Sequence, residues 1–233
     1  MKTLSKNALY FLLGSVFLFA SCKKKADDPV PTPIYPVATA SGTSYMPTNS
    51  TRSWTYQSAS YSYTTKPTGN TLDVNGRTYT ELQSLVTGNP TPSLGYSLEL
   101  GNQYYSYATF EKSTGGTGEL ELKMIDLDLP IGSTWSTVVE TNLYTLATYR
   151  FKYTGKGLTR TVNNVTYNDV ISVDLHTTAT LQNIPSGIPA SYFQSFTAAY
   201  KFDQTAYYAK GIGLIEQTSP TPSLQVVLVK YTK

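Results

Sequence analysis

Apolar and polar side chains alternate with a period of two along most of the chain after residue 45. Tyr149, Phe151 and Tyr153 alternate with Arg150 and Lys152, and the same pattern recurs in four further segments: 94–100, 119–124, 171–181 and 196–202. Successive side chains of a β-strand point to opposite faces of its sheet, so this period predicts half-buried strands. The run at 224–231 is almost continuously apolar, which predicts a strand in the middle of a sheet.

The alternation changes in two places. Leu120 and Leu122 share one parity, but Ile125 falls on the other. Because a β-bulge adds one residue to one strand, this slip predicts a bulge just before Ile125. The residues just before the predicted strand at 196–202 are ambiguous, because the region 189–196 also fits a short helix.

Two stretches of the chain resemble each other. One spans residues 74–82 and contains Asn75-Gly76, and the other spans 162–170 and contains Asn163-Asn164. Asparagine and glycine tolerate the positive φ that a type I′ turn requires at both central residues, so both stretches predict tight hairpins. Each follows a strand-like segment with a tryptophan, Trp54 in one case and Trp135 in the other. The repetition indicates an internal duplication, and the alternative is a chance likeness between two hairpins.

These patterns predict an all-β, mainly antiparallel fold. Two similar β-meanders, at about 48–130 and 131–233, would form a curved sheet, a half-barrel or a barrel with at most one short helix.

The first 21 residues have the features of an export signal. Lys2 and Lys6 precede an uncharged run from Ala8 to Ala20, which is too short to cross a hydrocarbon core of about 30 Å as a helix. The run ends at Phe19-Ala20-Ser21-Cys22, which resembles the lipobox of bacterial lipoproteins, although that pattern prefers leucine at the position of Phe19. The resemblance implies a diacylglyceryl group on the Cys22 thiol, and the alternative is a plain secreted protein.

We predict that residues 22–47 form a tether that leads into a single β-domain at residues 48–233. The cluster Lys23-Lys24-Lys25-Ala26-Asp27-Asp28 resembles the surface-export signal of Bacteroidota lipoproteins, and a solvated charged spacer is the alternative. Prolines then recur between residues 29 and 47, which favours a semi-rigid, extended segment.

Two short motifs in the β-rich part resemble a family of Bacteroidota outer-membrane lipoproteins. Residues 130–135 match the pattern P-x-G-x-x-W, and residues 207–215 contain a match to the strand pattern Y-A-x-G-[IV]-G-[LM]-[IV]. Several such families resemble the half-barrel of periplasmic lipoprotein carriers, which implies an open concave face and supplies no catalytic residues. Gly211 and Gly213 within the second motif predict a bulge, a tight bend or a close backbone approach.

Composition excludes several classes of partner and cross-link. The chain has 18 basic and 15 acidic residues, and removal of the signal with Lys2 and Lys6 leaves 16 against 15. Such a balance gives no electrostatic basis for nucleic-acid binding. Cys22 is the only cysteine, so the exported domain has no disulfide and depends on its core for stability. Acylated Cys22 is the predicted link to the membrane.

Few catalytic groups are present. His176 is the only histidine, which excludes a His-rich metal site and leaves one imidazole for a Ser-His-Asp triad. Asp174 lies two residues from it on the same strand face, too far to orient the ring directly. The neighbouring acids read as solvent-side residues and not as a glycosidase pair or a calcium loop: Glu119 with Glu121, and Asp126 with Asp128. We predict no enzymatic activity, no metal and no cofactor.

Tyrosine is abundant, with 20 copies. Adjacent tyrosines in a strand place one ring on each face, which makes two pairs candidates for stacking on a ligand: Tyr104 with Tyr105, and Tyr207 with Tyr208. Cross-strand aromatic packing is the simpler alternative.

The combined features predict a lipid-anchored domain of the outer membrane, exposed at the cell surface, with a binding or structural role. Its partners would be the membrane, through Cys22, and an unidentified glycan, lipid or protein, but not nucleic acid. One alternative is an envelope half-barrel that handles lipids or lipoproteins. Another is a surface protein that binds or cleaves glycans.

Overall fold

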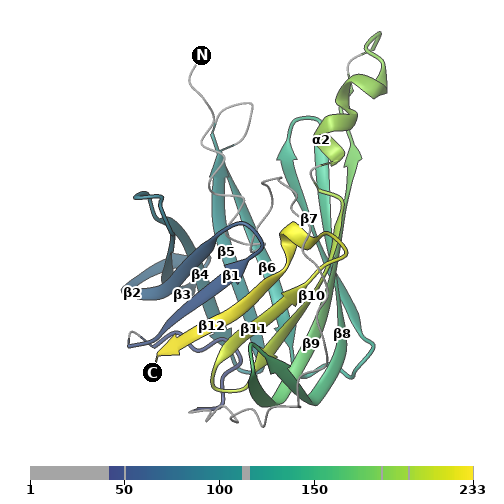
Figure 1. Cartoon of the computed structure of the whole chain (residues 1–233). Coiled ribbons are helices and arrows are strands. Elements are labelled where there is room, and N and C mark those ends of the chain that lie inside the picture. The colour runs from purple at the N-terminus through teal and green to yellow at the C-terminus, as the bar shows by residue number, and fades with distance from the viewer. Residues whose placement is uncertain (1–41, 50, 112–115, 185, 199, 233) are drawn as a thin grey trace.

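The computed structural model describes residues 42–49, 51–111, 116–184, 186–198 and 200–232. Cys22, the signal peptide and most of the tether lie outside these residues, and none of the described helices is long and apolar enough to cross a membrane. The described residues form one sheet of twelve strands (Figure 1): β1 (Ser53–Ser58), β2 (Ser62–Val74), β3 (Arg77–Val86), β4 (Ser93–Leu100), β5 (Gln103–Glu111), β6 (Thr117–Asp126), β7 (Thr134–Asn142), β8 (Thr145–Val162), β9 (Val165–Leu181), β10 (Phe202–Ala209), β11 (Gly213–Thr218) and β12 (Val226–Thr232).

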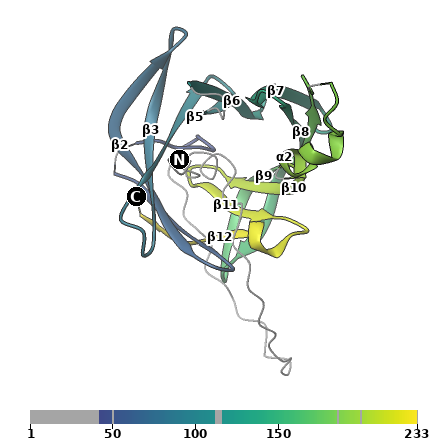
Figure 2. The same ribbon diagram turned by 90° about the horizontal axis from the view of Figure 1, so that it is seen from above.

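The sheet consists of two six-stranded antiparallel meanders, β1–β6 and β7–β12, joined where β1 pairs with β12. This joint makes the sheet long enough to curl round until its two end strands, β6 and β7, are neighbours. Figure 2 shows the resulting ring from above. The prediction of an all-β antiparallel fold is confirmed. The open concave half-barrel implied by the resemblance is replaced by a nearly closed barrel.

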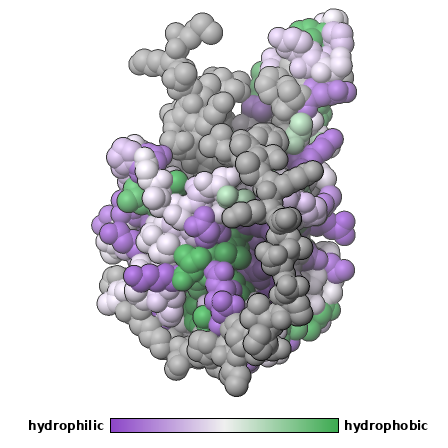
Figure 3. All heavy atoms as spheres, in the orientation of Figure 1, coloured by the Kyte–Doolittle hydropathy of each residue, from purple (hydrophilic) through white to green (hydrophobic). Residues whose placement is uncertain are grey.

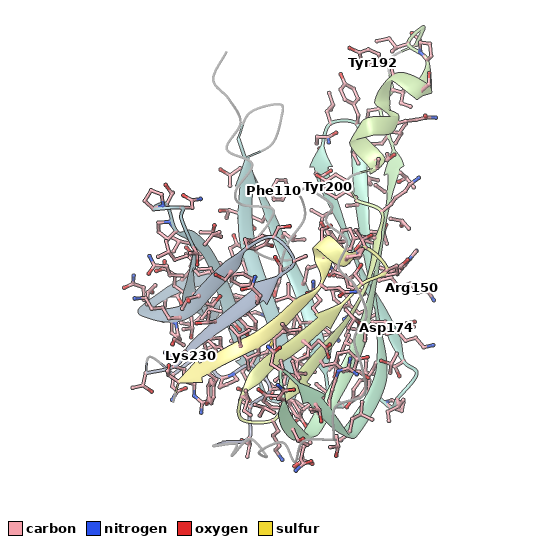
Figure 4. All side chains as sticks on the ribbon, in the orientation of Figure 1. Phe110, Arg150, Asp174, Tyr192, Tyr200 and Lys230 are labelled. Atoms are coloured by element: carbon pink, nitrogen blue, oxygen red, sulfur yellow. The ribbon has the colours of Figure 1, made fainter. Side chains whose placement is uncertain are left out.

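The barrel interior is filled by the side chains that the alternation predicted to be buried. Tyr149, Phe151 and Tyr153 are each 1% exposed or less, whereas Arg150 between them is exposed on the outer wall (Figure 4). These rings belong to a core cluster whose strand residues come from β5 to β10. A second cluster lies where β1, β11 and β12 meet the far end of the β8–β9 hairpin. The predicted central strand at the C-terminus is confirmed, since β12 pairs with both β1 and β11.

Local predictions at the bulge and the turns are confirmed. The register between β5 and β6 shifts opposite Met124, so Leu122 and Ile125 both reach the core with no exposed surface. Asn75 and Gly76 have φ of 50° and 76°, and Asn163 and Asn164 have 47° and 64°. Positive φ at both central residues is what the type I′ hairpin turn requires.

The strand predicted at 196–202 is wrong, and the alternative of a short helix in this region is confirmed. A 3-10 turn η1 (Ala190–Phe193) and a helix α2 (Gln194–Ala198) precede β10, which begins only at Phe202. Pro189 stands directly before this helical stretch with φ of −59°, a value that suits helix initiation. A further 3-10 turn, η2, covers Pro222–Leu224.

The stretch around Gly211 and Gly213 is a turn and not one continuous strand. It connects β10 to β11, and the two glycines have φ of 72° and 109°, which other residues rarely adopt. The close backbone approach predicted there does occur, because a Cβ on Gly213 would lie 3.5 Å from Trp54 Nε1. That indole nitrogen donates a hydrogen bond to the Ile212 carbonyl at 2.6 Å.

The segment before β1 closes one end of the barrel. Tyr45 is 6% exposed and packs edge-on against Tyr104, with ring centroids 6.4 Å apart. The amide of Tyr45 donates to the Tyr104 hydroxyl at 3.3 Å, and the amide of Gly211 donates to the Ser44 carbonyl at 2.6 Å. The chain therefore enters the fold at the end of the barrel that carries the β10–β11 turn.

Candidate functional site

The two predicted tyrosine pairs each place one ring inside the barrel and one outside. Tyr104 and Tyr208 belong to the interior cluster, 2% and 5% exposed. Tyr105 and Tyr207 are half-buried on the opposite face. Burial raises the pKa of the Tyr104 and Tyr208 hydroxyls above the usual value for tyrosine, because a low-dielectric interior disfavours the phenolate.

The two outward rings are each covered by an arginine. The Arg77 guanidinium lies 4.9 Å from the Tyr105 ring centroid, and that of Arg160 lies 3.6 Å from the Tyr207 centroid. Arg160 also pairs with Glu216. Each guanidinium occupies the ring face on which a planar ligand would stack. These contacts fasten the two long hairpins, β2–β3 and β8–β9, to neighbouring strands.

The barrel interior offers little room for a ligand. A cavity of about 20 Å³ is lined by side chains that include Gln204, Tyr208 and Gln217. Such a volume holds about one water molecule, whereas pockets for small molecules measure about 300–1,000 Å³. The interior of the described barrel therefore functions as a packed core.

A groove of about 400 Å³ opens where the two end strands of the sheet face each other. The far end of the β2–β3 hairpin and the ring of Tyr107 border it on one side, and β6 and β7 contribute its acidic and apolar residues. The lining comprises Val74, Asn75, Tyr107, Glu119, Glu121, Thr137, Val138, Val139 and Glu140.

The groove carries negative charge on both of its strands. Arg77 Nη1 and the Tyr79 hydroxyl both donate to Glu121 Oε1, each at 2.5 Å. Glu119 and Glu140 are exposed, and neither forms an ion pair within the described part of the chain. Burial and the nearby Glu119 carboxylate raise the pKa of the Tyr107 hydroxyl. The arrangement suits a ligand with positive charge.

The seam between β6 and β7 is held together at the end opposite to the groove. Trp135 Nε1 donates a hydrogen bond to the Lys123 carbonyl at 2.6 Å, and the Lys123 ammonium lies 5.8 Å from the Trp135 ring centroid. The indole also stacks on Phe151, with centroids 5.7 Å apart. This contact bridges two strands that, among the described residues, share no ladder of hydrogen bonds.

The other candidate groups of the sequence lie apart from the groove. His176 Nδ1 is 2.5 Å from Asp203 Oδ1, with both side chains more than half exposed, while Asp174 accepts from the Thr205 hydroxyl at 2.7 Å. Asp126 is buried and accepts from Lys123 Nζ at 2.5 Å, so it stabilises a turn. Searched over the described residues, no cluster of His, Cys, Asp and Glu is suited to hold a metal ion.

The outer surface of the sheet is mixed in character. Figure 3 shows an apolar area over β11 and β12, with polar side chains beside it, on the face seen in Figure 1. Scattered apolar residues on a protein surface are usual and do not by themselves define a site.

Neither a protein-family model nor a curated protein matches this sequence. One solved structure is similar in fold. It is a "putative lipoprotein" from Parabacteroides distasonis, 11% identical in sequence, with a TM-score of 0.45 over 82% of this chain and 100% of that one.

The sequence pattern does not reveal the groove. It predicts that Glu119 and Glu121 are ordinary solvent-side residues, and it does not single out Glu140. In β7 the exposed residues Val138 and Glu140 alternate with buried neighbours, a pattern that predicts a strand but not a groove. Which two strands end the sheet and meet at a seam depends on long-range pairing, for which a single sequence provides no signal.

Proposed function

We propose that this chain is a lipid-anchored envelope domain that acts by binding a partner at its outer surface and not by catalysis. The observation that carries this proposal is the contrast between the two hollows. The interior cavity holds about one water, whereas the groove of about 400 Å³ opens to the outside between β6 and β7. A packed barrel with an accessible groove suits a contact function.

The anchoring part of the proposal rests on Phe19-Ala20-Ser21-Cys22 and on the charged residues that follow. Two or more acyl chains on Cys22 would give stable attachment, since a single chain binds membranes only marginally. The mass of the N-terminal peptide tests this directly. We expect an acylated Cys22 in the native protein and release of a Cys22→Ser variant from the membrane fraction. An unmodified N-terminus in the native protein would contradict the anchor.

Cell-surface exposure is tested separately by adding protease to intact cells. Degradation of the domain before lysis supports exposure, and protection until lysis contradicts it. The control is a periplasmic protein in the same cells, which must stay intact until lysis.

The packed interior argues against the lipid-carrier alternative. A carrier needs an apolar cavity that takes an acyl chain, and about 20 Å³ is far too small. We expect no stoichiometric lipid when the soluble domain is purified, extracted with apolar solvent and analysed by mass spectrometry. A lipid present at one copy per protein would favour the carrier instead.

A glycan-directed function is the second candidate, and the groove is the observation that favours it. Glu140 on β7 borders the same hollow as Glu119 and Glu121 on β6, with the Tyr107 ring beside them. Carboxylates on two sides of a cleft are what glycoside cleavage uses. Release of reducing sugar from a panel of bacterial and plant polysaccharides, with Glu140→Gln as the comparison, tests for it. Activity abolished by that substitution would establish this function over simple contact.

A further inference from the structure

We propose that the groove between β6 and β7 binds an extended, lysine- or arginine-bearing peptide segment of a partner protein by strand addition. This inference rests on the proposed contact function and names the class of partner.

Two free sheet edges are the first observation. β6 ends one side of the sheet and β7 ends the other, and neither has a further strand partner among the described residues. The edge of a strand presents a row of unpaired N–H and C=O groups, which is a template for another strand. Extended peptides use such edges because main-chain hydrogen bonds supply affinity and side-chain contacts supply specificity.

The shape of the seam favours a preformed site. The Trp135 indole ties β7 to the Lys123 carbonyl of β6 near the chain connection at 127–133. The groove is lined by residues further along both strands, including Glu119 and Glu140. The seam is therefore fastened at one end and hollow at the other. A site that already exists costs the ligand less ordering than one that must open.

The carboxylates of the groove indicate that the bound peptide carries positive charge. The groove holds three carboxylates, and only Glu121 is neutralised, by Arg77. Glu119 and Glu140 leave net negative charge on both sides of the hollow. Val138 is 58% exposed beside them and offers apolar contact for the aliphatic stem of a lysine or arginine. The charged group of a lysine or arginine can therefore pair with Glu119 or Glu140 while its methylene groups contact Val138.

The groove is acidic, so an acidic peptide would be repelled. A neutral glycan would use the ring of Tyr107 and the carboxylates but would gain nothing from free strand edges. The combination of unpaired edges with surplus negative charge is what distinguishes a basic peptide from these occupants.

The test uses the soluble domain and three synthetic octapeptides. The first alternates lysine with threonine, the second replaces lysine by glutamate, and the third is the lysine peptide N-methylated at alternate residues. Fluorescence anisotropy measures binding, at low and at physiological salt. We expect the lysine peptide to bind and the other two to bind at least about tenfold more weakly, because one has the wrong charge and the other cannot form the ladder.

Charge variants test the location. Glu119→Gln with Glu140→Gln removes two exposed carboxylates, so the affinity for the lysine peptide should fall about tenfold. Asp203→Asn is the matched control, since Asp203 is 62% exposed and lies on β10. Thermal unfolding followed by circular dichroism verifies that all variants fold.

The outcomes separate this inference from the broader proposal. Equal binding of the methylated peptide, or no effect of the two glutamine substitutions, overturns strand addition at this groove. Binding of a polysaccharide from the panel without binding of any peptide also overturns it and leaves a contact function standing. An unmodified Cys22, by contrast, defeats the anchored part of the proposed function and does not affect the peptide result.

Discussion

Two substitutions that each remove one buried tyrosine hydroxyl should change stability in opposite directions. Tyr79 and Tyr149 both have rings with no exposed surface. The Tyr79 hydroxyl donates to Glu121 Oε1 at 2.5 Å. The Tyr149 hydroxyl is buried inside the barrel and has no hydrogen-bond partner among the described residues. Replacement by phenylalanine keeps each ring and deletes only the oxygen, so the comparison isolates the hydrogen bond.

The expected magnitudes follow from those environments. A hydrogen bond to a charged acceptor contributes about 1.5–3 kcal/mol. Because Arg77 still pairs with Glu121 in Tyr79→Phe, no carboxylate is left alone, and we expect a loss at the lower end, about 1.5 kcal/mol. In Tyr149→Phe the change removes a desolvated, unpaired hydroxyl, so the free energy of unfolding should rise by about 1 kcal/mol.

Urea unfolding followed by circular dichroism measures both changes. An unchanged dependence on denaturant concentration would show that only stability has moved. Tyr192→Phe is the control, because that side chain is 73% exposed and lies in η1, next to α2, in the connection between β9 and β10 (Figure 4). Its substitution should change the free energy by less than about 0.5 kcal/mol.

The reasoning fails if the two buried substitutions lower stability equally. That result would mean that the Tyr149 hydroxyl has a hydrogen-bond partner in solution. A stabilised Tyr79→Phe variant would refute a stabilising hydrogen bond from Tyr79 to Glu121.

Three further predictions concern pH, the seam and the core. Burial, with the Glu121 carboxylate, raises the pKa of Tyr79 to about 12; since the unfolded value is near 10, this contribution to stability is intact below about pH 10 and is lost as pH rises towards 12. The stability lost in Tyr79→Phe, measured by urea unfolding, should therefore shrink as pH rises through that window, and a loss independent of pH would contradict this. Trp135→Phe deletes the bond to the Lys123 carbonyl and should lower stability by about 1 kcal/mol while increasing amide hydrogen exchange in β6 and β7; unchanged exchange would exclude a role in closing the seam. Gly118→Ala should destabilise the domain in thermal unfolding, because the new Cβ would lie 2.3 Å from the Phe110 ring, and a neutral result would show that this ring moves freely.

Much of the strand pattern was predictable because it depends on local physics. Alternation identified the buried face of β8, including Tyr149 and Tyr153, since a strand next to a core must present one face to it. Asn163-Asn164 identified a hairpin turn because its positive φ values restrict the choice of residue. These inferences required no knowledge of which strands pair at long range.

The failures occurred where one local pattern fits two structures. Glycine suits both a bend within a strand and a turn between strands, so Gly211 and Gly213 could not distinguish one strand from two. Five residues of α2 are too few for a period of 3.6 to differ clearly from a period of two. The groove required knowledge that β6 and β7 are the end strands, which follows from the pairing of β1 with β12 and not from any short motif.

The pairing of β1 with β12 has a consequence for biosynthesis. The Ser53 and Thr232 hydroxyls lie 2.7 Å apart across this joint although 179 positions separate them in the sequence. During synthesis, β1 must therefore wait for β12 before one of its edges is covered. Contacts of such long range slow folding and leave exposed edges open to aggregation in the meantime. A chain without β12 would keep β1–β6 and β7–β11 but lose the joint between them, so the growing polypeptide needs protection until β12 has formed.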